Sequence, residues 1–334
     1  MKKEEDKNEI NPVRNHEVSH DDPISNGIKT FYSKDWPSDK AGEQDYELLD
    51  TGDHQKLERF GKYILVRPHE DAFWKKTLPK EKWDKADGIF FSSKRGSDTK
   101  GGWTLSFASD GVENKKKIPK WNMSYKDMKF SVSPTPFRHM GFFPEQASHW
   151  DLIEKRIKES KRKIRFFNLF GYTGIASLFA LRAGAEVTHL DASEQTITWL
   201  KENQELSGLE GLPMRVIVDD ALKFVEREIR RGNKYDAVVM DPPKFGRGPK
   251  GETWKIEENL PKLLSQINKI LSDDPLFVII TSYAIDSSSL SLGYALKDMM
   301  KNYLGTVEQG ELGILEKSNN RVIPLANTAI WEKN

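Results

Sequence analysis

Apolar runs and amphipathic stretches alternate along the chain after Trp150, and this regularity constrains the fold more than any other feature. Short apolar runs bounded by turn residues are typical of strands buried on both faces, whereas the stretches between them carry apolar residues at helical spacing. Strands that alternate with helices form mostly parallel sheets with helices on both faces. This part of the chain is therefore predicted to be an α/β domain.

The alternation assigns each predicted element a place in the chain. Strands are expected at 164–170, 186–190, 215–218, 235–240 and 276–281. Helices are expected at 175–183, 196–206, 222–230, 257–271 and 288–303. Two strand-like segments, 306–315 and 322–331, have no helix pattern between them and are expected to form a closing antiparallel hairpin.

The first part of the chain differs from the α/β part in composition. Residues 1–42 are rich in polar and charged residues and are expected to form a flexible tail, because they cannot bury enough apolar surface to offset the entropy of ordering. Residues 43–130 contain short apolar runs separated by turn residues, which predicts a small β-rich domain before the α/β domain at 131–334. Four tryptophans are expected to fill the core of this small domain, namely Trp74, Trp83, Trp103 and Trp121.

Composition limits the chemistry of the chain. Its 334 residues include 52 Lys and Arg against 51 Asp and Glu, a net charge of +1, so binding to a polyanion would need a local basic patch. The absence of cysteine excludes disulfides, thiolate metal ligands and a cysteine nucleophile. The first residues are too charged for a secretory signal, no apolar run reaches membrane-spanning length, and the histidines have no metal-binding spacing. A cytoplasmic protein that binds neither a membrane nor a metal is expected.

The loop at 168–174 follows the first predicted strand and is the expected ligand site, because ligands of open parallel sheets bind beyond the carboxyl ends of the strands. Gly171 and Gly174 permit a sharp turn and a close approach of the backbone to a ligand. The hydroxyl of Thr173 could cap the helix that follows. Two glycines at this spacing are weakly specific, and a turn that needs glycine for geometry alone explains them equally well.

Acidic residues follow the next two predicted strands. Asp191 stands where a carboxylate binds ribose hydroxyls in adenosine and dinucleotide sites. Asp220 is preferred over Asp219 as the acceptor for an exocyclic amino group such as that of adenine, although either residue could instead cap the following helix. A nicotinamide cofactor is disfavoured, because this loop lacks the first glycine of the Gly-x-Gly-x-x-Gly pattern.

The fourth predicted strand ends in residues 241–245, with the sequence Asp-Pro-Pro-Lys-Phe. Two prolines prevent regular ladder hydrogen bonding and hold this loop rigid at the edge of the sheet. Loop carbonyls could accept hydrogen bonds from an amino group, and the Phe245 ring could stack on a planar base. The motif alone could simply end a strand, but together with the glycine loop, Asp191 and Asp220 it indicates a reaction centre.

These motifs resemble those of class I S-adenosylmethionine-dependent methyltransferases, and among them the bacterial enzymes that methylate large-subunit ribosomal RNA. Residues 167–174 (Phe-Asn-Leu-Phe-Gly-Tyr-Thr-Gly) look like that family's cofactor loop, and 239–245 (Val-Met-Asp-Pro-Pro-Lys-Phe) look like its catalytic loop. Residues 141–146 are similar to its segment near the methionine end of the cofactor. The resemblance extends from Tyr46 to the C-terminus and implies a Rossmann-like sheet of seven strands, the last two forming a hairpin.

Together, the motifs and the resemblance assign roles to individual residues. S-adenosylmethionine is expected to contact Gln146, Asn168, Phe170, Gly171, Thr173, Gly174, Asp191, Ala192, Asp220, Ala221 and Asp241. Catalytic roles are expected for Asp241, Pro242, Pro243 and Phe245, and substrate contacts for Lys244, Phe245 and Arg247.

Two departures from the family's pattern concern the substrate. Family members that make 5-methylcytosine look to have a cysteine in the loop after the fifth strand, because carbon-5 of a pyrimidine needs a thiolate added at carbon-6. Ser282 stands at that place here, so carbon-5 chemistry by this route is excluded, and Ser282 is expected to be a hydrogen-bonding loop residue. The polar tail stands where the family carries an N-terminal RNA-binding module.

The leading hypothesis is methyl transfer from S-adenosylmethionine to a base nitrogen in RNA, with ribosomal RNA as the expected substrate and Asp241 and the Pro242 carbonyl as proton acceptors. RNA is expected to contact local basic patches beside the reaction centre and at 115–117 and 161–163, although solvated charged segments explain these patches as well. Two alternatives stay open, namely the same cofactor chemistry on a protein side chain or small molecule, and a non-catalytic binding module. The oligomeric state is open too.

Overall fold

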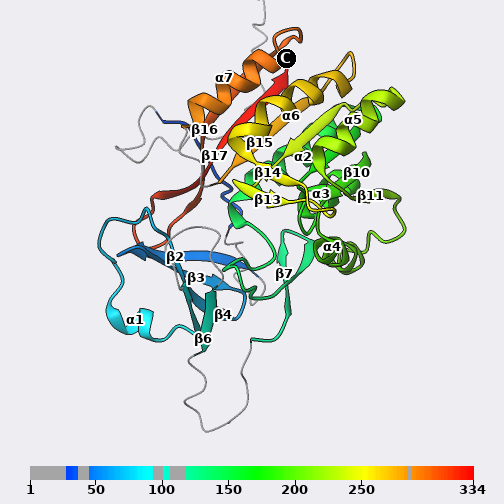
Figure 1. Cartoon of the computed structure of the whole chain (residues 1–334). Helices are drawn as coiled ribbons and strands as arrows, with labels where there is room; N and C mark the ends of the chain where they lie inside the picture. Colours follow the sequence, from blue (N-terminus) through cyan, green and yellow to red (C-terminus); the bar gives the residue numbers. More distant parts are fainter. Residues whose placement is uncertain (1–27, 37–44, 93–100, 106–117, 284–287) are drawn as a thin grey trace, which may run out of the picture.

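The computed structural model describes residues 28–36, 45–92, 101–105, 118–283 and 288–334, and its largest element is an eight-stranded sheet (Figure 1). The strand order is β1-β16-β17-β15-β12-β9-β10-β11. These strands are β1 (Thr30–Phe31), β9 (Arg165–Leu169), β10 (Glu186–Asp191), β11 (Met214–Val218), β12 (Ala237–Met240), β15 (Phe277–Ser282), β16 (Gly305–Leu315) and β17 (Val322–Lys333). The five strands from β9 to β15 in this sheet run parallel, whereas β17 is antiparallel to both β15 and β16. The predicted parallel sheet with a closing hairpin is confirmed.

Helices cover both faces of this sheet, because alternate residues of its central strands point to opposite faces. In β12, Val239 packs with one core cluster and Val238 with the other, and Ile279 and Val278 of β15 divide in the same way. The first face is covered by α2 (Ala147–Glu159), α3 (Ile175–Arg182) and α4 (Glu194–Leu206), and the second by α5 (Ala221–Arg231), α6 (Ile256–Ile270) and α7 (Ser289–Met299). The predicted helices are confirmed with shifts of a few residues at their ends.

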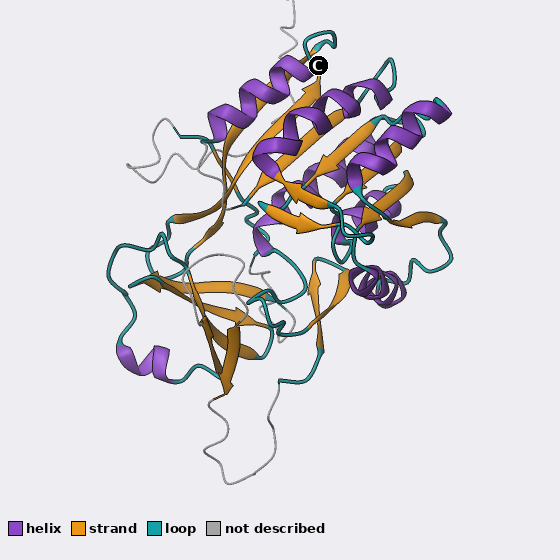
Figure 2. Ribbon diagram, viewed as in Figure 1, coloured by secondary structure: helices purple, strands orange, loops and turns teal. Residues whose placement is uncertain are grey.

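A smaller, strand-rich unit lies beside the helix-covered sheet (Figure 2). It contains a five-stranded sheet of β2 (Tyr46–Gly52), β3 (Gln55–Phe60), β4 (Tyr63–Pro68), β5 (Gly88–Ser92) and β6 (Gly101–Leu105), with the short helix α1 (Lys80–Asp84). The hairpin of β7 (Trp121–Tyr125) and β8 (Met128–Val132) instead packs on α4. Tyr46, Phe60 and Phe130 belong to the same core cluster as α2 and α3, so the core runs without a break across the boundary predicted near residue 130.

The structure corrects the expectations for the first 42 residues and for the number of sheet strands. β1 adds an eighth strand, in parallel with β16, to the seven that were expected. Trp36 is only 3% exposed and donates from Nε1 to the Pro144 carbonyl at 3.1 Å. Residues 28–36 are therefore not part of a flexible tail, because the buried Trp36 indole and the pairing of β1 hold them on the folded protein despite their polar neighbours. Residues 1–27 and 37–42 of the predicted tail lie outside the described residues.

Three further elements follow from tertiary packing and were not predicted. They are the 3-10 helix η2 (Pro144–Gln146), the helix α2 that continues from it, and a hairpin of β13 (Phe245–Arg247) and β14 (Thr253–Lys255). The hairpin begins directly after the two prolines at 242 and 243, where the chain turns away from the main sheet. In the part of the chain that the structure describes, no helix has the length and apolarity needed to cross a bilayer.

Candidate active site

A cavity of ≈ 880 Å³ opens at the carboxyl ends of the parallel strands. Residues that follow β9, β10, β11, β12 and β15 line it on one side, and residues of the β-rich unit line it on the other. Parallel strands bring their carboxyl ends to one edge, so segments far apart in the sequence meet there. Nine residues of the predicted site line this cavity: Phe170, Asp191, Ala192, Asp220, Ala221, Asp241, Pro243, Lys244 and Arg247.

The predicted cofactor loop after β9 is held by close packing. A Cβ atom at Gly171 would collide with the His189 ring, and one at Gly174 would collide with Leu200. Gly174 also has a φ of 84°, a left-handed conformation that favours glycine. The glycines, which are not among the residues that line the cavity, thus serve the geometry of the turn, the alternative considered from the sequence.

The side chains of Asn168 and Thr173 form hydrogen bonds inside the protein, and neither residue is among those that line the cavity. The Asn168 amide donates to the Ser177 hydroxyl at 2.9 Å. The Thr173 hydroxyl donates to the Gly141 carbonyl at 2.6 Å, so it does not cap the helix as proposed from the sequence. The structure therefore assigns both residues a structural role, because their polar groups are already paired inside the protein.

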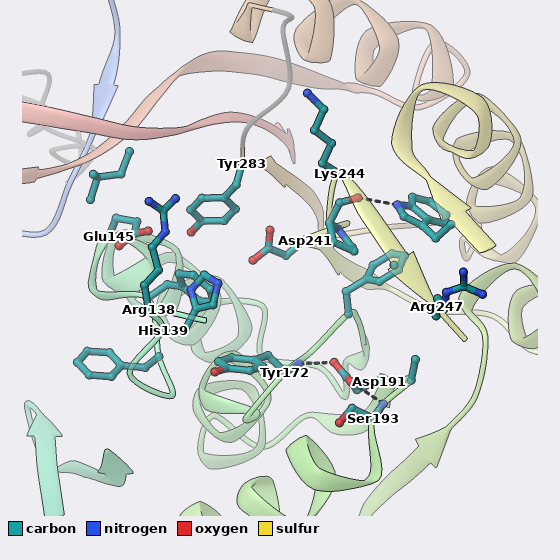
Figure 3. A pocket seen from close by; sticks show the side chains of 18 of the residues that line it. Arg138, His139, Glu145, Tyr172, Asp191, Ser193, Asp241, Lys244, Arg247 and Tyr283 are labelled. Atoms are coloured by element: carbon teal, nitrogen blue, oxygen red, sulfur yellow. Dashed lines mark hydrogen bonds between the residues drawn. The ribbon is translucent and has the colours of Figure 1, made fainter. Parts of the chain in front are cut away.

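Asp191 ends β10 at the cavity and is fixed by three donors. Its carboxylate accepts from the backbone N–H groups of Tyr172 at 2.8 Å and Ser193 at 2.9 Å, and from the Thr196 hydroxyl at 2.8 Å. Figure 3 shows this carboxylate between Tyr172 and Ser193. A carboxylate can accept further hydrogen bonds, so this preorganised group remains suited to ribose hydroxyls.

Asp219 and Asp220 follow β11, and both line the cavity. Asp220 caps α5, with its Oδ1 accepting from the Lys223 N–H at 3.0 Å. Asp219 accepts from the Asp220 N–H at 2.8 Å and pairs with Arg227. Asp220 is thus the residue that caps the following helix, which was one of the two roles considered from the sequence. Asp219 instead forms the ion pair with Arg227.

Asp241 lines the cavity beside Tyr283 (Figure 3), whereas Gln146 is not among the residues that line it. The Gln146 amide donates to Asp241 Oδ2 at 3.3 Å and to the Tyr283 hydroxyl at 3.1 Å. Burial, with a contribution from the negative charge of Glu145, raises the pKa of Asp241 to about 8. Burial also raises the pKa of Glu145, which is 5% exposed. Two carboxyls that resist ionisation therefore face the same part of the cavity.

The orientation of the Gln146 amide is set by a buried histidine that the sequence analysis did not single out. His149 is 1% exposed, and its Nδ1 lies 2.8 Å from Gln146 Oε1. Its Nε2 lies 3.2 Å from the Thr328 hydroxyl of β17. Because the amide oxygen of Gln146 is an acceptor, Nδ1 carries the proton, and the amide N–H₂ group is directed toward Asp241.

An aromatic group beside Asp241 was also not predicted. The Phe143 ring lies 5.1 Å from that of Tyr283, 5.6 Å from that of Tyr172 and 5.2 Å from that of His139, measured between ring centroids. All four residues line the cavity. They come from three separate segments, so no local pattern could have indicated that they meet.

The loop after Asp241 differs in part from its predicted role. Trp254 donates from Nε1 to the Pro243 carbonyl at 2.6 Å and packs on Phe170, with ring centroids 4.9 Å apart. The Pro243 carbonyl therefore already accepts one hydrogen bond, whereas the carbonyl singled out from the sequence was that of Pro242. Pro242 is buried, and neither it nor Phe245, which is 47% exposed, is among the residues that line the cavity. The β13–β14 hairpin turns the Phe245 ring outward, which weakens its predicted role in stacking.

Ser282 and the basic runs also differ from expectation. Ser282 is the last residue of β15, is 1% exposed, and its hydroxyl has no hydrogen-bond partner among the described residues, so it is not a hydrogen-bonding loop residue. Residues 161–163 precede β9 and therefore lie at the edge of the sheet opposite the cavity, where Arg162 pairs with Asp236 and Lys163 with Glu186. The 115–117 run lies outside the described residues.

Comparison with known proteins identifies the family. Residues 147–282 match the family model described as conserved hypothetical protein 95. Ribosomal RNA large subunit methyltransferase K of Neisseria meningitidis is 28% identical over 178 residues, which are 52% of this chain and 49% of that protein. The corresponding K/L protein of Pseudoalteromonas translucida is 31% identical over 146 residues, which are 43% of this chain and 20% of that protein. The chain spans about half the length, or less, of these curated relatives.

A solved structure decides the assignment. The S-adenosylmethionine-dependent methyltransferase from Agrobacterium tumefaciens is 40% identical, superposes with a TM-score of 0.80, and is matched over 86% of this chain and 90% of that one. The chain belongs to the S-adenosylmethionine-dependent methyltransferases. A Streptococcus mutans chain, a candidate methyltransferase of the same kind, has a TM-score of 0.64 at 15% identity, over 89% of this chain and 77% of that one, and supports the fold alone.

The cavity of this methyltransferase fits its cofactor, S-adenosylmethionine. Asp191 and Asp220 present carboxylates at the tips of neighbouring strands, and carboxylates can accept hydrogen bonds from the hydroxyls and the amino group of an adenosine. Asp241 and Glu145 are carboxyls whose ionisation is suppressed by burial, and a ligand that carries positive charge would relieve that cost. In the described residues, no group of three His, Asp or Glu side chains is arranged to hold a metal ion.

We expect the affinity of the methyltransferase for S-adenosylmethionine to rise with pH between about 5.5 and 7.5. Because the pKa of Asp241 in the free protein is about 8, this carboxyl holds a proton in that range. A cationic ligand favours the carboxylate, so binding releases the proton, and affinity increases by up to about tenfold per pH unit. Calorimetry in buffers of different ionisation enthalpy measures the released proton. A pH-independent affinity, or an unchanged slope in Asp241→Asn, would contradict this expectation.

Proposed function

We propose that this methyltransferase acts on a ring or exocyclic nitrogen of a base in RNA, in the cytoplasm, with ribosomal RNA as its substrate. The observation that carries the proposal is the Asp241 carboxyl beside an aromatic group that includes Phe143 and Tyr283. Aromatic rings offer stacking surfaces to an unpaired base, and a carboxylate can accept a hydrogen bond or a proton from its nitrogen. The curated relatives from Neisseria and Pseudoalteromonas are named as ribosomal RNA large subunit methyltransferases, which supports the same substrate class.

Each part of the site has a proposed task. S-adenosylmethionine supplies a methyl group that its sulfonium sulfur already activates. Asp191 and Asp220 would hold the adenosine part of the cofactor. Glu145 lines the region proposed for its methionine part, and Gln146 donates to Asp241 beside that region. Asp241 would orient the acceptor nitrogen and take its proton, and the surrounding walls would exclude water. Lys244 and Arg247 would contact the substrate at the mouth of the cavity.

The absence of a thiol supports nitrogen over carbon-5 as the acceptor. The chain contains no cysteine, and a thiolate is the group that activates carbon-5 of a pyrimidine. Ser282, which stands where the family's thiol is expected, is buried at 1% exposure within the sheet. A nitrogen carries its own lone pair and needs only positioning and removal of a proton. The proposed reaction therefore uses no covalent intermediate with the protein.

Labelled cofactor tests the substrate class directly. The protein would be incubated with labelled S-adenosylmethionine and with RNA, protein and metabolite fractions from cells that lack its gene. We expect label in the RNA fraction, and within it in ribosomal RNA as a methylated base nitrogen. Fractions from cells that carry the gene are the control, because their sites should already be methylated. Label in protein or in small molecules, with none in RNA, would overturn the proposal in favour of the alternative acceptors.

A further inference from the structure

One wall of the cavity carries a group of basic and imidazole side chains, and of these only His139, through the aromatic group, has a role in the scheme above. We call it the basic wall, and its members are Lys56, Arg67, His69, Arg138 and His139. Figure 3 shows Arg138 and His139 on the opposite side of Asp241 from Lys244 and Arg247. The wall comes from β3, from the end of β4 and from the segment before η2, so it belongs to the β-rich unit and its connection to the main sheet.

The inner part of the basic wall concentrates positive charge. Lys56 and Arg67 face each other across β3 and β4 and share one carboxylate, that of Glu58. Arg67 makes two contacts of 2.6 Å with Glu58, and Lys56 Nζ lies 3.3 Å from the same carboxylate. Glu58 is 0% exposed, and its pKa is lowered to about 2 by the two cations despite its burial. Arg67 is buried and the Lys56 side chain is 13% exposed, and these two cations share the single Glu58 carboxylate, so the three groups together carry a net positive charge. The Glu145 carboxyl interacts with both cations, but burial opposes its ionisation.

The outer part of the basic wall is Arg138. Its backbone is held by Arg67, whereas its guanidinium pairs with Glu70, a carboxylate that a ligand anion could replace. Its backbone carbonyl accepts from Arg67 Nη1 at 2.9 Å, which ties it to β4. Its guanidinium donates to both carboxylate oxygens of Glu70, at 2.9 and 3.0 Å. The Glu70 side chain is 49% exposed, compared with 22% for Arg138. A surface ion pair of this kind is weak, so a ligand anion could take the place of Glu70.

Between these cations lies a histidine with an unused polar atom. His69 is 7% exposed, and its Nε2 has no hydrogen-bond partner among the described residues. Burial and the charge of Lys56 lower the pKa of His69 to about 4. Burial together with Arg67, Arg138 and Lys56 lowers the pKa of His139 to about 3. Both imidazoles are therefore neutral at pH 7. Burial and nearby positive charge lower the pKa of both histidines. A buried polar atom without a partner calls for a ligand that supplies one.

We propose that the basic wall binds an oxyanion of the methyl acceptor, the phosphate next to the nucleotide whose base enters the cavity. This inference rests on the proposed function, because it assumes a nucleotide acceptor. In this arrangement Asp191 and Asp220 would contact the cofactor, and the basic wall would contact the acceptor. A phosphate would neutralise the excess charge beside Lys56, replace Glu70 on Arg138 and accept a hydrogen bond from His69 Nε2.

Nucleotide binding to protein saturated with S-adenosylhomocysteine tests this inference without requiring turnover. Each of the four ribonucleoside 5′-monophosphates would be titrated against its matching nucleoside, which lacks the phosphate. We expect at least one monophosphate to bind about tenfold or more tightly than its nucleoside, because a hydrogen-bonded charged group contributes roughly that much. The ratio should fall toward one in His69→Ala and Arg138→Gln. Arg162→Gln, at the opposite edge of the sheet, is the matched control and should keep the wild-type ratio.

A spectroscopic measurement on the unmutated protein covers the case in which a variant does not fold. The imidazole ¹⁵N signals of His69 should shift when inorganic phosphate or a monophosphate is added, and should stay in place with a nucleoside. Equal affinities for nucleoside and monophosphate in the wild type, ratios retained in both variants, or unmoved His69 signals would each overturn the inference. The labelling experiment tests the substrate class and this titration tests the wall, so the failure of one can be told from the failure of the other.

Discussion

Replacing Asp241 by Asn should reduce the turnover number by about 100-fold or more, the range expected when a positioned proton acceptor is lost. The amide has nearly the shape of the carboxylate and can still accept from Gln146, which donates to Asp241 Oδ2 at 3.3 Å. It cannot take a proton or carry a negative charge. Single-turnover rates at saturating cofactor measure the chemical step without contributions from product release.

The dissociation constant for S-adenosylmethionine should change much less in this variant, by less than about tenfold at pH 6.5. The pKa of Asp241 is about 8, so at that pH the wild-type carboxyl must release a proton to attract the cationic cofactor, and the cost of that release offsets most of the attraction that the variant lacks. Asp236→Asn is a matched control, because Asp236 lies just before β12 and Asp241 lies just after it. Asp236 is at the opposite edge of the sheet from the cavity, where its carboxylate pairs with Arg165 at 3.1 Å. Asp236→Asn should lower the melting temperature and leave the turnover of folded protein unchanged. A fall in turnover of less than threefold for Asp241→Asn would exclude Asp241 as the proton acceptor.

Replacing Asp191 by Ala should have the opposite profile, with the dissociation constant for S-adenosylmethionine rising by about 100-fold. Hydrogen bonds to a charged group contribute about 1.5–3 kcal/mol each, and a carboxylate that binds ribose hydroxyls loses them on truncation. The turnover number at saturating cofactor should fall far less, because Asp191 is placed at the adenosine end. Isothermal titration with S-adenosylmethionine and with S-adenosylhomocysteine should give similar losses, since both carry the same ribose.

The anchoring role of Asp191 needs its own control, because its carboxylate also accepts from Tyr172, Ser193 and Thr196. Thr196→Val removes the hydroxyl that donates to Asp191 Oδ1 at 2.8 Å and leaves the carboxylate in place. If Asp191 acts mainly through the cofactor, Thr196→Val should weaken binding by only a few fold. A loss as large as that of Asp191→Ala would show that the anchoring of the loop accounts for the effect. Equal losses of cofactor binding in Asp191→Ala and Asp241→Asn would contradict the division of roles.

The outcome for individual residues shows how far a sequence can predict a site. Asp191, Asp220 and Asp241 stand at or just beyond the carboxyl ends of β10, β11 and β12, and all three line the cavity as expected. By contrast, Asn168 lies in β9 and Thr173 in the loop that follows it, yet their side chains bond to Ser177 and to the Gly141 carbonyl. The periodicity of apolar residues predicts where a strand ends, so a motif at that point can be assigned to the loop that follows. Whether a side chain points into the cavity depends on neighbours that are distant in the chain.

Residues missed from the sequence share a different feature, which is that they meet across large separations. Glu145 and Tyr283 reach the region of Asp241 from η2 and from the end of β15. His149 sets the orientation of Gln146 through a buried hydrogen bond to Thr328 of β17. None of these residues stands in a pattern that distinguishes it from an ordinary core or loop residue. Their roles arise from packing, which no local spacing encodes.

The sequence by itself determined the parallel sheet, the hairpin that closes it and the edge at which the site lies, because burial on both faces of a sheet imposes a periodicity that can be read directly. The tertiary structure alone decided the composition of the acceptor side. Lys56 and His69 come from the β-rich unit and Arg138 from its connection to the main sheet. They line the same cavity as Asp241 only because one continuous core joins that unit to the main sheet. Charge and hydrogen bonding act over a few ångströms in space, so the chemistry of this wall exists only after the two units have packed together.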